Sequence, residues 1–275
     1  MERTERGTIV MHITITGNLG SGKSTICKLL SDKYQFEIYS TGKVQRELAR
    51  EMSLTTLELN QLMRNDHQYD HMIDDATARI SRENPDKNII FDSRLAWYFV
   101  ESSFKVFVSV STDVAAERVM NDHRGEEERY ESIEEARSML IERAAAESVR
   151  YKEIYKVNYM DFSNYDLVID STYCTPNLIA EIILEEAKEY MKNGNNPCKK
   201  RLVSPCRLLK KEDITNDDKE SLETLVKEYE NVSKVTDKII KVEKNEESFT
   251  VVEGIEYAKA TYIANVPYVS IMIIN

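Results

Sequence analysis

The chain has 275 residues, of which 41% are hydrophobic and 31% charged, so it can bury one large core or two smaller ones. A net charge of −11 argues against a broad nucleic-acid surface, which needs a basic face, but allows a small anionic ligand held by local arginines. The charged N-terminus lacks a signal-peptide stretch, no run approaches a membrane span, and the four cysteines show no CxxC spacing. We therefore expect a cytoplasmic protein in a reducing compartment, with no membrane partner.

The most informative stretch covers residues 17–24, which match the phosphate-loop pattern G-x-x-x-x-G-K-[ST]. A β-branched run over 9–16 predicts a strand before it, and apolar residues at 26, 29 and 30 predict a helix after it. In this context the loop N–H groups cradle phosphates, Lys23 reaches the β- and γ-phosphates, and Ser24 ligates Mg²⁺. The expected ATP contacts of the loop are Gly17, Asn18, Leu19, Gly20, Ser21, Gly22, Lys23, Ser24 and Thr25.

Strands and helices alternate after the loop. Strands are predicted at 36–39, 88–91, 104–110 and 165–170, and helices at 43–50, 67–82, 112–120, 132–156 and 176–191, with a short helical piece around Leu57, Leu59 and Leu62. This alternation predicts an α/β fold with a five-stranded parallel sheet covered by helices on both faces. Ligands of such sheets bind beyond the carboxyl ends of the strands, where the loop, Thr41, Asp92 and Ser111 all fall.

Several charged residues near this edge could serve phosphoryl transfer, which depends on positioning and positive charge. They are Arg46, Arg94, Arg118, Arg124, Arg143 and Arg150. Each could also be a solvated helix arginine, and the i, i+4, i+7 spacing of Arg143, Glu147 and Arg150 also fits an ion-pair ladder. Asp92 directly follows an apolar strand. This position is typical of an acid that helps to bind magnesium, but it also fits the N-cap of the helix that follows.

Residues from about 11 to 191 resemble the cytidylate kinases, in particular the short, archaeal-like type of these P-loop nucleoside monophosphate kinases. The resemblance rests on five stretches taken in order: 13–24 with the phosphate loop, 40–49 (Ser-Thr-Gly-x3-Arg-Glu-Leu-Ala), 92–96 (Asp-Ser-Arg-Leu-Ala), 142–151 (Glu-Arg-x3-Glu-x2-Arg-Tyr) and 165–170 (Tyr-Asp-Leu-Val-Ile-Asp). The family usually has Glu-Gly-Arg where this chain has Asp92-Ser93-Arg94, so the effect of Ser93 on activity stays open.

Such kinases move the γ-phosphate of ATP to CMP or dCMP with Mg²⁺. The resemblance implies catalytic roles for Lys23, Arg94, Arg143 and Arg150. It implies acceptor contacts from Thr41, Gly42, Arg46, Asp70, Arg94, Arg143, Glu147 and Arg150. It further implies that Arg118 and Arg124 lie over ATP, that residues 171–175 lie against the adenine, and that Ser24 and, through water, Asp92 hold the metal.

A polar stretch broken by glycine and proline, residues 194–201, is predicted to link a kinase-like domain over 1–193 to a small α+β domain over 202–275. In the latter, a strand and turn are expected over 202–209, strands at 238–242, 248–252 and 268–274, and helices at 217–232 and 254–264. The last strand is apolar on both faces and must be covered. The order resembles, more weakly, the ParB/sulfiredoxin-like fold. Ile255, Glu256 and Tyr257 stand where that family has its His and Arg, which favours a regulatory or interaction role.

The leading hypothesis is an ATP-dependent (d)CMP kinase. A P-loop kinase for another small acceptor is one alternative, and a nucleotide-binding regulator signalling through the C-terminal domain is another. The choice among CMP, dCMP and UMP, and between monomer and homodimer, is left open by the sequence.

Overall fold

The computed structural model describes residues 10–55, 58–59, 62–63, 68–121, 130–195 and 199–274. Within this part of the chain the strands form one nine-stranded sheet with the order β2-β3-β1-β4-β5-β6-β9-β7-β8. No helix in these residues is long and apolar enough to cross a membrane.

The first five strands are parallel neighbours. They are β1 (His12–Gly17), β2 (Glu37–Ser40), β3 (Ile89–Asp92), β4 (Phe104–Ser109) and β5 (Leu167–Asp170). Register pairs Thr14 with Phe91 and Lys105, and Ser109 with Asp170, so the carboxyl ends meet at one edge. The predicted five-stranded parallel sheet is confirmed.

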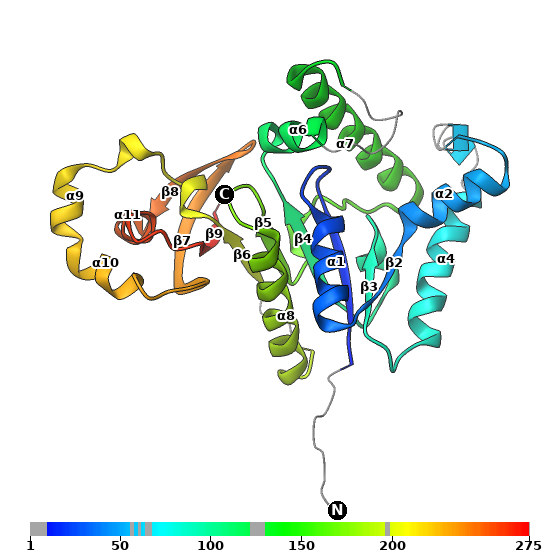
Figure 1. Cartoon of the computed structure of the whole chain (residues 1–275), viewed down its shortest axis with the longest axis horizontal. Coiled ribbons are helices and arrows are strands. Elements are labelled where there is room, and N and C mark those ends of the chain that lie inside the picture. The colour runs from blue at the N-terminus through cyan, green and yellow to red at the C-terminus, as the bar shows by residue number, and fades with distance from the viewer. Residues whose placement is uncertain are drawn as a thin grey trace, which may run out of the picture.

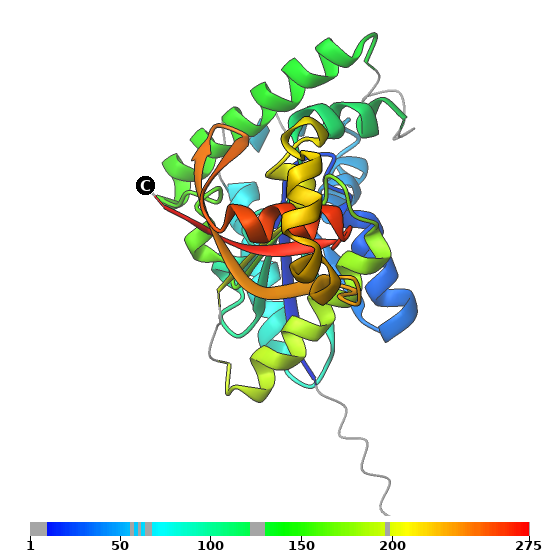
Figure 2. The same cartoon turned by 90° about the vertical axis from the view of Figure 1, so that its left-hand side faces the viewer.

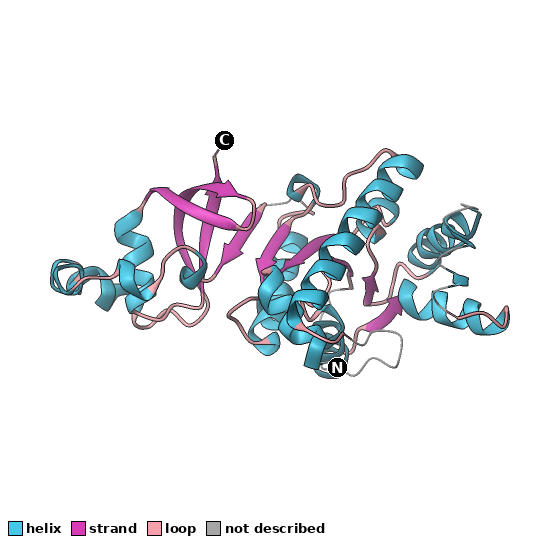
Figure 3. Cartoon of the chain, turned by 90° about the horizontal axis from the view of Figure 1, so that it is seen from above, coloured by secondary structure: helices cyan, strands magenta, loops and turns pink. Residues whose placement is uncertain are grey.

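Helices cover both faces of this parallel part (Figure 3). They are α1 (Lys23–Tyr34), α2 (Thr41–Glu51), α4 (Gln68–Glu83), α5 (Ala96–Phe99), α6 (Thr112–Asn121), α7 (Ile133–Tyr155) and α8 (Pro176–Lys192). Helices α1 and α8 pack side by side over one face, while α6 and α7 lie at the edge where the strands end (Figure 1).

Strand β4 shows why both faces need cover. Val106 and Val108 point into the core under α1 and α8, whereas Phe107 points the opposite way, against Trp97 and Tyr165. Because successive side chains of a strand alternate between faces, an unbroken apolar run requires helices on both sides.

The C-terminal part continues the same sheet. Its strands are β6 (Lys200–Val203), β7 (Val235–Asn245), β8 (Ser248–Glu253) and β9 (Tyr268–Ile273), and its helices are α9 (Asn216–Ser221), α10 (Glu223–Tyr229) and α11 (Ile255–Ile263). Strand β6 pairs in parallel with β5, and β9 pairs antiparallel with β6 and parallel with β7. We call residues 199–274 the C-terminal unit; its own core joins β6, β7, β9 and α11.

The stretch 202–209, expected to be a strand and turn, is confirmed as such: β6 ends at Val203, and Pro205, which has no N–H to donate, begins a 3₁₀ turn after Ser204. One predicted helix in this unit was wrong. The helix expected over 217–232 is two helices that break at Leu222.

The expected linker also contains structure. Residues 196–198 lie outside the described part of the chain, but Lys200 and Arg201 belong to β6 and pair with β5. The division into two domains stays a prediction, and main-chain pairing crosses its boundary. Around Leu57, Leu59 and Leu62, only residues 58–59 and 62–63 are described, and they are helical.

Candidate active site

The phosphate loop leaves β1 at Gly17 and enters α1 at Lys23. A Cβ on Gly17 would lie 2.1 Å from the carbonyl oxygen of Val108, so only glycine lets β1 and β4 approach this closely. Gly22 has φ of +81° and precedes the helix, and no side chain in the described residues caps the N-terminus of α1. The first N–H groups of α1 are therefore left for an anion, as the sequence motif predicts.

Lys23 folds back on this loop. Its Nζ donates to the carbonyl oxygens of Gly17 (3.1 Å) and Asn18 (3.2 Å). Burial, together with the nearby Arg94 guanidinium, lowers the pKa of Lys23 to about 7, although the carboxylates of Asp92 and Glu147 partly oppose this shift. An arriving phosphate would favour the ammonium form, because an opposite charge nearby raises the pKa of a lysine.

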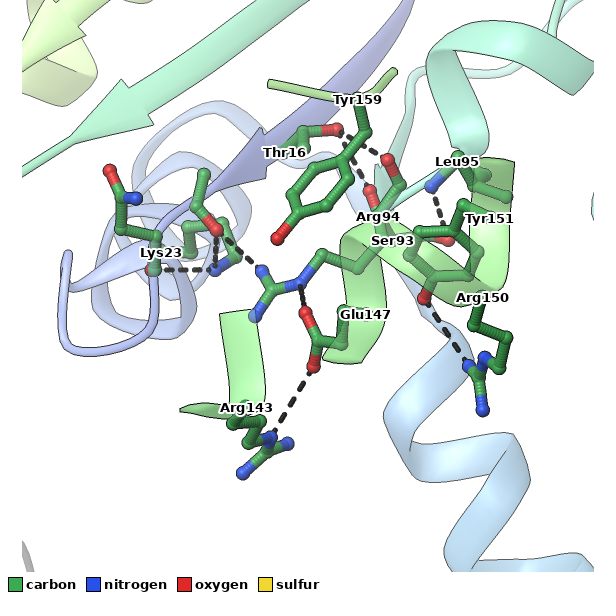
Figure 4. A network of polar contacts seen from close by, with 12 residues as sticks. Thr16, Lys23, Ser93, Arg94, Leu95, Arg143, Glu147, Arg150, Tyr151 and Tyr159 are labelled. Carbon is green, nitrogen blue, oxygen red and sulfur yellow. Dashed lines mark hydrogen bonds and ion pairs between the residues drawn. The ribbon is translucent and has the colours of Figure 1, made fainter. Parts of the chain in front are cut away.

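Arg94 connects the loop to the long helix α7. Its Nε donates to Glu147 at 2.8 Å and its Nη1 donates to the carbonyl oxygen of Gly17 (Figure 4). The side chains of Arg94 and Glu147 are 15% and 17% exposed, so the ion pair is largely shielded from water. Burial would lower the pKa of Arg94, but Glu147 raises it above its usual range.

Two more of the expected arginines extend from α7. The Nε of Arg143, half exposed, donates to the second oxygen of Glu147 at 3.3 Å, and Arg150 donates to the hydroxyl of Tyr151 at 3.4 Å. The predicted i,i+4 ion pair is thus present, yet Glu147 also receives Arg94. The structure brings Lys23, Arg94, Glu147 and Arg143 into one cluster (Figure 4).

Residues that could hold Mg²⁺ lie beside this cluster. Ser24 is exposed in the first turn of α1. Asp92 is half-buried at the end of β3, and its carboxylate is close enough to Lys23 to raise the pKa of that lysine. A hydroxyl and a carboxylate are the hard oxygen donors that Mg²⁺ prefers alongside phosphate oxygens. Among the described residues no group of three or more His, Cys, Asp or Glu side chains could hold a metal ion by itself. These two residues therefore fit a metal that arrives with ATP.

Ser93 stands at the position where the family usually has glycine, and it has hydrogen-bond partners there. Its hydroxyl accepts a hydrogen bond from the N–H of Leu95 at 3.4 Å, and its carbonyl oxygen accepts one from Thr16. Within 92–96 the serine side chain therefore has a defined place in the turn.

The expected acceptor residues of α2 and α4 are only partly described. Thr41 is half-buried at the start of α2, and Arg46 is exposed, with its Nη1 at 3.6 Å from where a Cβ on Gly42 would lie. Asp70 lies in α4, but its side chain is outside the described residues.

On the expected ATP side, Arg118 of α6 bonds to both nearby loops. Its Nη1 donates to the carbonyl oxygen of Gly20 (3.3 Å) and to the hydroxyl of Ser171 (3.1 Å), and its Nη2 donates to the carbonyl oxygen of Ser171 (2.7 Å). Arg124 and the acidic loop around it lie outside the described residues.

The sequence patterns did not predict the residues that bind the main-chain carbonyl of Arg94 or lie beside its side chain. The Thr16 hydroxyl and the Trp97 indole N–H both donate to the carbonyl oxygen of Arg94, at 3.3 and 3.1 Å. Tyr159 lies beside the Arg94 side chain (Figure 4), and both Tyr159 and Tyr151 contribute to the raised pKa of Arg94. Thr16 ends a strand beside the phosphate loop, which is a usable signal; nothing in the sequence points to Tyr159.

The Arg94–Glu147 pair should contribute to stability in a pH-dependent way. Burial raises the pKa of Glu147, but Arg94, Arg143 and Lys23 outweigh it and hold the pKa below the ordinary 4.5. The contribution is therefore complete above pH 4.5 and is lost as pH falls through the lower folded pKa. Urea unfolding should show wild type more stable than Glu147→Gln at neutral pH, with the difference closing below pH 4.5. A pH-independent difference would contradict this assignment.

The chain is similar in sequence to known proteins. A family model described as the cytidylate kinase-like family matches residues 12–173. A protein of Methanococcoides burtonii named cytidylate kinase is 34% identical over 173 residues, or 63% of this chain and 94% of the relative. One of Haloarcula marismortui with the same name is 32% identical over 187 residues, or 67% and 93%.

Solved structures align with this chain at a lower sequence identity. Shikimate kinase from Bacteroides thetaiotaomicron aligns with a TM-score of 0.46 at 15% identity, over 66% of this chain and 98% of that chain.

Proposed function

The chain belongs to the cytidylate kinase-like family, and from that premise we propose that it transfers the γ-phosphate of ATP to CMP or dCMP. Its class, an ATP-dependent nucleoside monophosphate kinase, follows from the family. The cytidine base of the acceptor is the part that we propose.

One observation carries the proposal: arginines from two different elements bind a single carboxylate, and one of them also bonds to the phosphate loop. Arg94, after β3, and Arg143, on α7, both bind Glu147, and Arg94 also reaches the loop at Gly17. A site for two phosphorylated substrates needs this arrangement, with one positive group at the donor phosphates and others facing them.

The mechanism assigns a task to each group. The loop N–H groups and Lys23 bind the β- and γ-phosphates of ATP, and Arg94 and Arg143 bind the acceptor phosphate and neutralise charge on the transferring group. Glu147 holds both arginines in orientation. Ser24 and Asp92 would hold Mg²⁺, which supplies further neutralisation of the phosphate charge when it is bound with ATP.

A panel of acceptors tests the proposal. With ATP and Mg²⁺ fixed, ADP release should be at least about 100-fold faster with CMP or dCMP than with AMP, GMP or no acceptor, since a base-specific site rejects analogues that leave buried polar groups unpaired. UMP belongs in the same panel, because it differs from CMP only in the base edge.

The other outcomes separate the alternatives. A faster reaction with AMP, GMP or an acceptor that is not a nucleotide would mean a kinase of different specificity. Tight ATP binding without ADP release for any acceptor would point to a nucleotide-binding regulator and contradict the proposal.

A further inference from the structure

The C-terminal unit touches the kinase-like part where the adenine of ATP is expected. The contact lies at residues 170–175, which follow β5 and lead into α8. Figure 1 shows the unit joined to the edge of the sheet beside β5, and Figure 2 shows it from its own side. Contacts at this turn and at the start of α6 form a connected network.

Asp170 is the centre of the network. It is 3% exposed, and its carboxylate accepts hydrogen bonds from the N–H of Thr172 (3.0 Å) and the hydroxyl of Ser109 (3.3 Å). The carboxylate also forms an ion pair with Arg207 of the C-terminal unit, whose Nε lies 3.6 Å from Oδ2. Burial raises the pKa of Asp170 and Arg207 opposes that rise. A buried carboxylate deprived of its cation is costly, so the position of this turn depends on Arg207.

Tyr268 holds the main chain of the same residue. Its side chain is fully buried, and its hydroxyl donates to the carbonyl oxygen of Asp170 at 2.7 Å. Next to it, the thiol of Cys174 donates to the carbonyl oxygen of Pro267 at 3.4 Å. The C-terminal unit therefore fixes both the side chain and the backbone at the start of the 170–175 turn.

A further contact runs to α6. Arg207 also donates, through Nη2, to the carbonyl oxygen of Glu247 in the β7–β8 hairpin (2.8 Å). The carboxylate of Glu247 accepts hydrogen bonds from the N–H of Thr112 (3.0 Å) and from its hydroxyl. Thr112 begins α6, the helix that carries Arg118.

Arg118 connects this network to the phosphate loop. It bonds to Ser171, the residue after Asp170, and to Gly20 of the loop. The path Arg207–Asp170–Ser171–Arg118–Gly20 thus leads by direct contacts from the C-terminal unit to the phosphate loop, and Glu247 supports the same helix from its other end.

We propose that the C-terminal unit positions the donor side of the active site, with Arg207 and Tyr268 as positioning residues for ATP. Neither residue reaches the phosphate loop itself; each acts through the 170–175 turn and Arg118. The inference rests on the proposed function for the identity of the donor nucleotide. It predicts that damage to this network weakens ATP binding while leaving acceptor binding intact, because Arg94 and Arg143 lie on other elements.

The test uses the full chain. Arg207→Ala should raise the Kd for Mg·ATP, measured by calorimetry without acceptor, by about tenfold, the scale of one lost charge-assisted contact. Arg207→Lys and Tyr268→Phe, which keep the charge or the ring, should raise it less. The KM for CMP should stay within about twofold in all three variants.

Lys234→Ala is the matched control. Lys234 joins the same two parts of the molecule through Glu181 and Glu185 of α8, and within the described part of the chain its side chain makes no hydrogen bond or ion pair with residues 170–175. Its removal should leave the Kd for ATP unchanged. An unchanged Kd in folded Arg207→Ala, an equal loss in Lys234→Ala, or a parallel rise in the KM for CMP would each overturn the proposal.

Failure of the proposed function is distinguishable from failure of this inference. The ATP Kd requires no acceptor, so a protein that never phosphorylates CMP still tests the network. Should Arg207→Ala not fold, the conservative variants Arg207→Lys and Tyr268→Phe decide by the same ATP measurement, and wild-type Kd values in both would overturn the proposal.

Discussion

Lys23→Ala is expected to lower kcat by about 10³-fold, the scale of removing one preorganised charge from a phosphoryl-transfer site. In the structure the Nζ of Lys23 is held over the loop by the carbonyl oxygens of Gly17 and Asn18, where the donor phosphates are proposed to bind. The fold should persist, since burial makes the lysine charge a cost rather than a gain in the ligand-free protein.

The measurement is ADP release at saturating ATP and CMP, together with a thermal melt. Lys33→Ala is the matched control: Lys33 lies on the same helix, is exposed, and donates to Asn177 at 2.9 Å. It should keep wild-type turnover. Near-normal turnover of Lys23→Ala would contradict the proposed kinase mechanism.

The sequence was most informative where local pattern decides the structure. The phosphate loop required a strand before it and a helix after it, and β1 and α1 stand there. Apolar runs such as 104–110 predicted buried parallel strands, and β4 is buried on both faces for that reason. Strand β9 was expected to need cover on both faces: Tyr268 packs into the main core and Val269 and Ile271 pack into the core of the C-terminal unit, whereas Met272 is exposed.

Contacts between distant residues were beyond such reasoning. Helical spacing indicated the Arg143–Glu147 pair, but the partner with which Glu147 makes its shorter contact, Arg94, lies 53 positions away in the chain. Likewise, the glycine and proline around residue 194–197 suggested a free linker, whereas the pairing of β6 with β5 depends on which edge of the sheet is open, a property of the assembled fold.

Arg94→Lys is expected to raise the KM for CMP by about 100-fold and the KM for ATP by less than about threefold. Arg94 uses Nε for Glu147 and Nη1 for Gly17, which leaves other guanidinium N–H groups for a phosphate. A lysine offers three donors on one atom and cannot hold Glu147 and grip a phosphate in bidentate fashion at once.

Two variants show whether the effect belongs to Arg94 itself. Arg137→Lys, on the same helix as Glu147 but half exposed and paired with Asp113 at 3.3 Å, should leave both KM values unchanged. Glu147→Gln should raise the KM for CMP by a smaller factor than Arg94→Lys, because Arg94 would keep its charge but lose its orientation. Equal increases in the two KM values of Arg94→Lys would instead mean that Arg94 does not serve the acceptor phosphate alone. Glu147 would then orient a group shared by both substrates rather than one reserved for the acceptor.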